Sequence, residues 1–187
     1  AGIVKYPVIG NSSDIPAETD PDLPFLERYK IHLQVGYERW LSQYESKKGV
    51  GSPIMFVMTE DIDSAKEVAQ YLEATYPDVL KGKVLNIHTK LKGHKKKELI
   101  DGKRVSVFVE GSENLKPDEV RAIRQMSRDL DKKDSPYRCV VSVAMLREGW
   151  DVRNVTTVVP LRAFSAASGI LAEQTLGRGL RRMFPGS

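Results

Sequence analysis

The chain has 187 residues, of which 41% are hydrophobic and 29% are charged. This length and balance predict an ordinary globular protein with one main domain and a sizeable core. No apolar run reaches the roughly 20 residues that a membrane-spanning helix needs, so we expect no membrane partner. A net charge of +4 and a pI of about 9.1 mildly favour a polyanionic partner. The first residue is not methionine and no signal peptide is visible, so we expect a fragment of a longer protein or a processed chain.

Cys139 is the single cysteine, which excludes an internal disulfide and any multi-cysteine metal site. It lies in an apolar run, where a free cysteine usually acts as a small hydrophobic residue. The three histidines have no metal-ligand spacing. A reducing cytoplasm is therefore the expected compartment.

The first third of the chain predicts a short strand, a loop and a helix. Residues 3–9 favour a strand interrupted by Pro7, and residues 10–24 are rich in Ser, Asp, Pro and Thr. Residues 25–44 carry apolar and aromatic side chains at steps of three and four, namely Leu26, Tyr29, Leu33, Gly36, Tyr37, Trp40 and Tyr44. Such a stripe is more typical of a packing helix than of a ligand-binding one.

From residue 54 onward, strands and helices alternate. The predicted strands are 54–58, 84–88, 105–109, 137–143 and 155–159, and the predicted helices are 60–74, 117–130 and one from about Ser168. Residues 93–100 are rich in lysine and predict a short helical or loop segment. The alternation predicts an α/β fold with a mainly parallel sheet. The loops that follow its strands would share one edge, where such sheets bind ligands.

The helix near the C-terminus combines an apolar face with a basic one. At about 100° per residue, Gln174, Arg178, Arg181 and Arg182 share one arc. Arginine suits phosphate because its planar fork donates several hydrogen bonds and stays charged. Gly177 and Gly179 weaken the helix, which favours a close approach to a ligand or backbone. The alternative is an amphipathic surface helix with a solvated basic face.

A second informative stretch runs from Val140 to Val152 and joins two apolar runs. It holds a small hydroxyl at Ser142, a glycine at Gly149 and a carboxylate at Asp151. Such a loop can offer donors to phosphates and an acceptor to a ribose hydroxyl. The alternative is a helical turn with solvated charges and Trp150 in the core.

These two stretches together resemble motifs V and VI of superfamily 2 helicases. The first stretch carries Ser-Val-x-Met-Leu-Arg-Glu-Gly-Trp-Asp-Val, and the second carries Gln-x-x-Gly-Arg-x-x-Arg. The residues at these positions are most similar to those of the Res subunit of type III restriction enzymes. The resemblance covers residues 53–184 and implies a RecA-like three-layer domain with a mainly parallel central sheet. Residues 51–187 would be this second motor domain, and residues 1–50 an interdomain exit strand, loop and helix, with the helix a family insertion before the second domain.

The resemblance implies roles for individual residues. Arg178 and Arg181 match the arginine fingers that reach the γ-phosphate of ATP across the cleft between the two motor domains. The positions expected near the nucleotide are Gln174, Gly177, Gly149 and Asp151. The hydroxyls expected on the nucleic-acid backbone are those of Ser142, Thr59 and Thr89. The last two come from weaker matches to motifs IV and IVa.

The chain lacks a Gly-x-x-x-x-Gly-Lys-Ser/Thr phosphate loop and an acidic metal box. In the family both lie on the first motor domain, and the nuclease lies further toward the C-terminus. ATP and Mg²⁺ would therefore be held mainly by the first domain, and we expect no ATP hydrolysis by this chain alone. The implied partners are that first RecA-like domain, DNA and a methyltransferase subunit.

A lysine-rich run, Lys90, Lys92 and Lys95 to Lys97, adds a candidate DNA contact. Lysines neutralise phosphates without reading sequence, although such a run can also be a solvated loop. Two other functions remain open. The chain can belong to another superfamily 2 motor, such as a DNA-repair or RNA helicase, or be a non-catalytic nucleic-acid-binding α/β module.

Overall fold

The computed structural model describes residues 20, 22–47, 51–87, 93–100, 103–110, 117–143 and 152–161. The strand predicted at residues 3–9 and the helix predicted from Ser168 lie outside these ranges.

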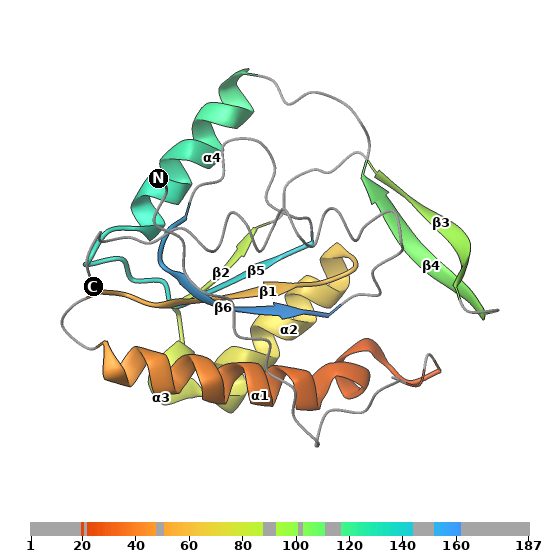
Figure 1. The fold of residues 1–187 in the computed structure, drawn as a ribbon, viewed down its shortest axis with the longest axis horizontal. Coiled ribbons are helices and arrows are strands. Elements are labelled where there is room, and N and C mark those ends of the chain that lie inside the picture. The colour runs from red at the N-terminus through yellow and green to blue at the C-terminus, as the bar shows by residue number, and fades with distance from the viewer. Residues whose placement is uncertain are drawn as a thin grey trace, which may run out of the picture.

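A four-stranded parallel sheet forms the centre of the fold (Figure 1). Its strands are β1 (Ile54–Met58), β2 (Val84–Ile87), β5 (Cys139–Ser142) and β6 (Val155–Pro160), in the order β2-β5-β1-β6. All three neighbouring pairs are parallel. The inner strands β1 and β5 are buried along their whole length, as their continuous apolar sequences predict. The predicted α/β class with a parallel central sheet is confirmed.

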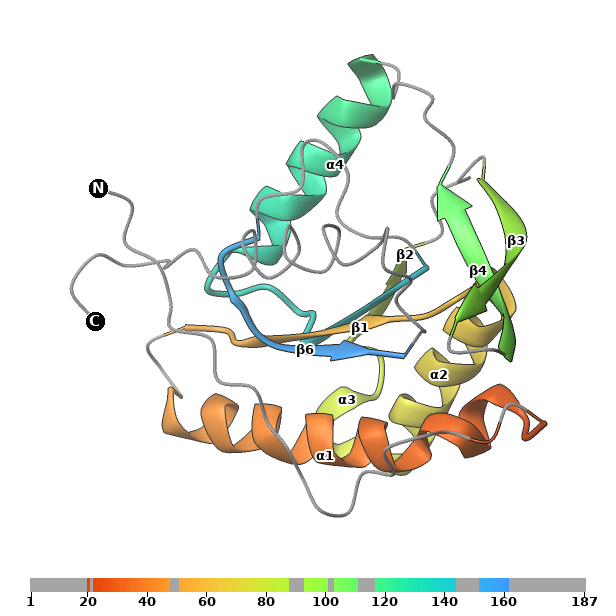
Figure 2. The ribbon, with the colours of Figure 1, turned by 45° about the vertical axis from the view of Figure 1, so that its right-hand side comes forward.

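Helices cover both faces of this sheet (Figures 1 and 2). One face carries α1 (Phe25–Ser46), α2 (Ile62–Thr75) and the short α3 (Pro77–Leu80), and the other carries α4 (Pro117–Leu130). The start of α2 is set by Asp61, whose side chain accepts a hydrogen bond from the Ser64 N–H at 2.8 Å. This N-cap satisfies a donor that the helix itself cannot, and it places the start after the predicted Glu60.

Two apolar clusters fill the spaces between the layers. Successive residues of β1 alternate between them, because side chains of a strand point to opposite faces. Met55 and Val57 join the cluster beneath α1 and α2, whereas Ile54, Phe56 and Met58 join the one beneath α4. The predicted inward stripe of α1 is confirmed, with Tyr29, Leu33, Gly36, Tyr37 and Trp40 buried.

Close contacts bind α1 to the rest of this core. A Cβ atom added at Gly36 would lie 2.4 Å from Val159 Cγ2 of β6, so only glycine permits this approach. The Trp40 indole N–H donates to the Pro53 carbonyl oxygen at 3.0 Å, directly before β1. The rings of Tyr37 and Tyr76 stack at 3.6 Å between centroids. Helix α1 is therefore part of the same hydrophobic core as the sheet.

The prediction of a helical or loop segment at residues 93–100 was wrong. That segment is β3 (Gly93–Ile100), which pairs with β4 (Lys103–Glu110) in a separate antiparallel two-stranded sheet. The strand predicted at 105–109 is confirmed within β4. A lysine-rich segment has little strand propensity of its own, so the apolar partner strand decides its conformation. The local signal was Asp101-Gly102, a dipeptide typical of two-residue hairpin loops.

Among the described residues, no helix combines the length and the apolar character that crossing a membrane requires.

Candidate functional site

Hydrogen bonds between main-chain groups extend the sheet past the ends of three strands. The Thr59 N–H donates to the Ser142 carbonyl oxygen at 3.0 Å, and the Leu161 N–H donates to the Met58 carbonyl oxygen at 2.7 Å. The residues that follow β5, β1 and β6 therefore start from one row at the carboxyl edge of the sheet. This is the edge at which open parallel sheets bind their ligands.

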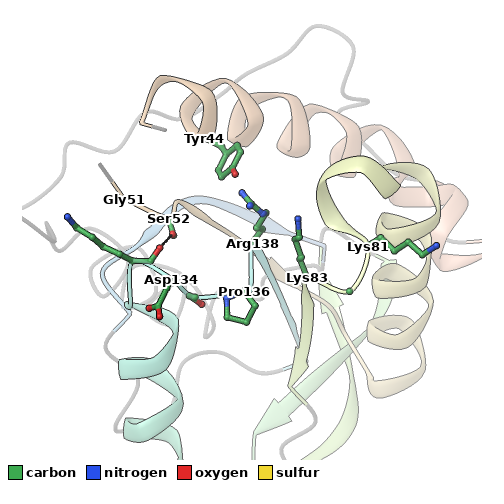
Figure 3. Close-up of a pocket in the computed structure, with 11 residues that line it drawn as sticks. Tyr44, Gly51, Ser52, Lys81, Lys83, Asp134, Pro136 and Arg138 are labelled. Atoms are coloured by element: carbon green, nitrogen blue, oxygen red, sulfur yellow. Dashed lines mark hydrogen bonds between the residues drawn. The ribbon is translucent and has the colours of Figure 1, made fainter. Parts of the chain in front are cut away.

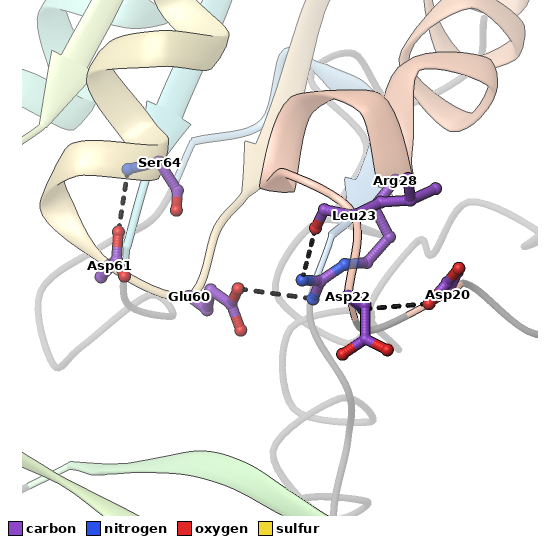
Figure 4. A network of polar contacts seen from close by, with 7 residues as sticks. All are labelled: Asp20, Asp22, Leu23, Arg28, Glu60, Asp61 and Ser64. Carbon is purple, nitrogen blue, oxygen red and sulfur yellow. Dashed lines mark hydrogen bonds and ion pairs between the residues drawn. The ribbon is translucent and has the colours of Figure 1, made fainter.

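Thr59 is fully buried in the turn between β1 and α2. Its hydroxyl donates to the Asp61 carbonyl oxygen at 3.3 Å, so it supports the turn that starts α2. The next residue, Glu60, pairs with Arg28 of α1 at 3.8 Å, and Arg28 also donates to the Leu23 carbonyl oxygen (Figure 4). These contacts fix the beginning of α1 against the turn that carries Thr59.

Ser142 ends β5 and is almost completely buried, as is Val143 after it. The described chain resumes at Val152, which is buried in the cluster beneath α4. Just beyond it, the N–H groups of Arg153 and Asn154 donate to the Asp131 carboxylate at 2.8 and 3.0 Å. The Asn154 carbonyl in turn accepts from the Ile54 N–H at the start of β1. Ser142 and Val143 thus lie at the carboxyl edge of the sheet, and Arg153 and Asn154 lie at the amino-terminal edge.

The structure brings together two of the predicted site residues, Thr59 and Ser142, at neighbouring strand ends. It places Lys95, Lys96 and Lys97 on β3, in a hairpin on the side of the sheet where the strands end (Figures 1 and 2). Because successive strand positions alternate, positions 95 and 97 share one face of the hairpin and position 96 takes the other. The remaining predicted residues lie outside the described ranges, namely Thr89, Gly149, Asp151, Gln174, Gly177, Arg178 and Arg181.

Cys139 is completely buried at the start of β5. Burial raises the pKa of its thiol far above the ordinary range, so the reactive thiolate does not form near neutral pH. The residue acts as a small hydrophobic side chain, as predicted. Within the described ranges, no group of three or more His, Cys, Asp or Glu side chains could hold a metal ion.

The sequence interpretation missed a second polar site, at the amino-terminal edge of the sheet. A cavity of about 550 Å³ opens there, and its lining includes Tyr44, Lys83, Ser135 and Arg138 (Figure 3). Lys83 and Arg138 each directly precede a strand. In the sequence, a single charged residue at such a position cannot be told from an ordinary surface residue. Their adjacency follows only from the parallel pairing of β2 with β5, which no local pattern indicates.

Comparison with known proteins returns no match: no family model, curated protein or solved structure resembles this chain closely enough to be counted. The similarity to motifs V and VI therefore rests on the residues of the chain itself.

Proposed function

We propose that this chain is the second RecA-like domain of a superfamily 2 DNA translocase, of the kind found in the Res subunit of type III restriction enzymes. One observation carries the proposal. The segment that resembles motif V begins at Ser142, which is bonded to Thr59 at the carboxyl edge of a parallel sheet. The segment that resembles motif VI follows β6, which runs parallel to β1 and ends at that same edge. Each of the two segments thus follows, in the sequence, a strand that ends at the edge where such folds bind ligands.

In this proposal the domain completes an ATP site whose phosphate loop and Mg²⁺ ligands belong to the first motor domain of the same protein. Arg178 and Arg181 supply cationic forks to the γ-phosphate, where charge spreads over the phosphoryl oxygens in the transition state. Gln174, Gly177, Gly149 and Asp151 lie near the nucleotide. Thr59, Thr89, Ser142 and Lys95 to Lys97 follow the DNA backbone, and the protein acts in the cytoplasm with its methyltransferase subunit.

The decisive experiment replaces each arginine finger in the full-length protein. Arg178→Ala and Arg181→Ala should each reduce ATP hydrolysis by about 10³–10⁵-fold while ATP binding persists. Arg182→Ala is the matched control, because this neighbouring arginine lies outside the motif and its loss should leave turnover close to wild type. Normal turnover in both finger variants would defeat the proposal.

The isolated chain offers a complementary experiment. It should not hydrolyse ATP alone, because it has no phosphate loop, and equimolar addition of the first motor domain should restore DNA-stimulated turnover. Robust hydrolysis by the purified chain on its own would contradict the assignment to a second motor domain. Turnover stimulated by RNA and not by DNA would point instead to an RNA helicase.

A further inference from the structure

The cavity lies at the amino-terminal edge of the sheet, opposite to the carboxyl edge that holds Thr59 and Ser142. Its walls come from the end of α1, the residues before β1, the turn before β2 and the loop before β5 (Figure 3). Its volume of about 550 Å³ is within the range of roughly 300–1,000 Å³ that is usual for small-molecule sites. The residues that line the cavity include four cationic ones, Lys81, Lys83, Lys133 and Arg138, and one acidic one, Asp134.

The parallel register places Lys83 and Arg138 side by side. Val84 of β2 pairs with Cys139 of β5, so the residues just before them are also neighbours. The Arg138 N–H donates to the Lys83 carbonyl oxygen at 2.9 Å, which fixes the two backbones relative to each other. Figure 3 shows both side chains reaching into the same space beneath Tyr44, whereas Lys81 points away. Main-chain hydrogen bonding thus sets two cationic residues on neighbouring strands side by side.

Arg138 is part-buried and forms no ion pair among the described residues. Its guanidinium lies 4.3 Å from the centroid of the Tyr44 ring, and its Nε is buried with no hydrogen-bond partner among the described residues. Burial lowers the pKa of Arg138, but arginine remains protonated in proteins. A buried donor that makes no hydrogen bond costs free energy, which an anion bound here would offset.

Ser135 adds a neutral donor to the same cavity. Its Oγ is also buried with no hydrogen-bond partner among the described residues. A hydroxyl, an ammonium and a guanidinium together match the several acceptor oxygens of a phosphate group, to which arginine donates in pairs. The combination of unpaired donors, excess positive charge and a bounded volume favours a small phosphate ester over a carboxylate.

We propose that this cavity binds the phosphate group of a small phosphorylated molecule, with Arg138 and Lys83 as the principal donors and Ser135 as a third. The proposal does not depend on the motor function, because the site lies at the other edge of the sheet and uses none of the motif residues. The aromatic face of Tyr44 holds the guanidinium in place by a cation–π contact. The guanidinium is therefore oriented before the ligand arrives.

The test titrates the ¹⁵N-labelled chain with inorganic pyrophosphate, and in parallel with sodium chloride at matched ionic strength. The Arg138 Nε–Hε resonance should shift and exchange more slowly with pyrophosphate and should not respond to chloride. By calorimetry, Lys83→Gln and Arg138→Gln should each weaken pyrophosphate binding by about tenfold or more. Lys66→Gln and Arg124→Gln, at exposed positions of α2 and α4, are the matched controls and should bind as wild type.

Arg138→Gln also removes the contact with Tyr44, so its melting temperature is measured alongside. Lys83→Gln keeps the main-chain bonds and therefore tests the site independently of folding. Wild-type pyrophosphate binding by a folded Lys83→Gln protein would overturn the proposal. Equal effects of chloride and pyrophosphate on the Arg138 Nε–Hε resonance would also overturn it. Binding of duplex DNA but not of pyrophosphate at this cavity would overturn it too.

Discussion

The main-chain N–H of Thr59 donates to the carbonyl oxygen of Ser142 at 3.0 Å, one step beyond the register pair Met58–Ser142. The contact uses backbone atoms alone, so it fixes the two positions relative to each other whatever their side chains do. Both groups are buried, and a buried backbone pair opens only when the surrounding structure opens.

Hydrogen exchange should reveal that extension of the sheet. We expect the amide protons of Thr59 and Leu161 to exchange as slowly as that of Met55, which donates to the Arg138 carbonyl oxygen at the other end of β1. Amide-resolved exchange monitored by NMR measures this directly. Thr59 exchange at the rate of an unprotected loop would show that the row at the carboxyl edge is not held together.

Replacing Lys95 to Lys97 by alanine should weaken the binding of the chain to duplex DNA. Each lost phosphate contact reduces the slope of log K against log[salt] by about 0.9, so the slope should fall by up to about 3. Fluorescence anisotropy over a salt series measures that slope. Replacing the exposed lysines Lys30, Lys47 and Lys66 is the matched control and should change it little. An unchanged slope after the hairpin substitutions would reject a DNA contact there.

Gly36→Ala should destabilise the protein by about 1–3 kcal/mol, because the new Cβ would lie 2.4 Å from Val159 Cγ2. Urea unfolding measures the loss as a lower midpoint at unchanged slope. Gly51→Ala is the matched control, since a Cβ there meets no atom within 4 Å. Adding Val159→Ala should recover part of the loss, and strict additivity of the two substitutions would contradict a direct clash.

The stability of the fold should fall as the pH rises from about 10 to 12. Burial, followed by the neighbouring Tyr71, Tyr37 and Glu38, raises the pKa of Tyr76 from 10.0 to about 12. The folded state therefore holds this proton more tightly than the unfolded state does. The resulting stabilisation is complete below pH 10 and is lost as the pH rises through the folded-state pKa.

Tyr76→Phe keeps an aromatic ring against Tyr37 and removes the titrating hydroxyl. The difference in free energy of unfolding between wild type and variant should stay constant below pH 10 and shift in favour of the variant above it. Urea unfolding at several pH values measures this difference, and ultraviolet absorbance follows the phenolate. A difference that does not change with pH would show that Tyr76 titrates alike in both states.

Local sequence patterns predicted most of the described elements. The limits of β1 and α4 match their predicted ranges, because each is bounded by a clear signal: a continuous apolar run, or a proline at the first helical position. Such signals lie within a few residues of one another. These local signals agree with the folded structure because the sheet and its two helix layers need the apolar faces that these segments provide.

The missed features depend on contacts between distant segments. Strand β3 forms because Lys95, Lys96 and Lys97 pair with Phe108, Val107 and Ser106 of β4, which outweighs the weak strand propensity of lysine. Likewise, Lys83 and Arg138 are far apart in the chain and meet only through the register of β2 and β5. The motif residues Thr59 and Ser142 were found because the resemblance named them, whereas their hydrogen bond required the fold.

The contacts of α1 determine where this domain can be cut. Helix α1 covers the face of the sheet that holds Met55, Val57 and Val159, and Trp40 is completely buried in that cluster. A fragment that starts at residue 51 would lack α1. It would expose Met55, Val57 and Val159 to water as a contiguous apolar patch, which is a common origin of aggregation. A fragment that keeps this face of the sheet covered therefore has to include α1 from Phe25 onward.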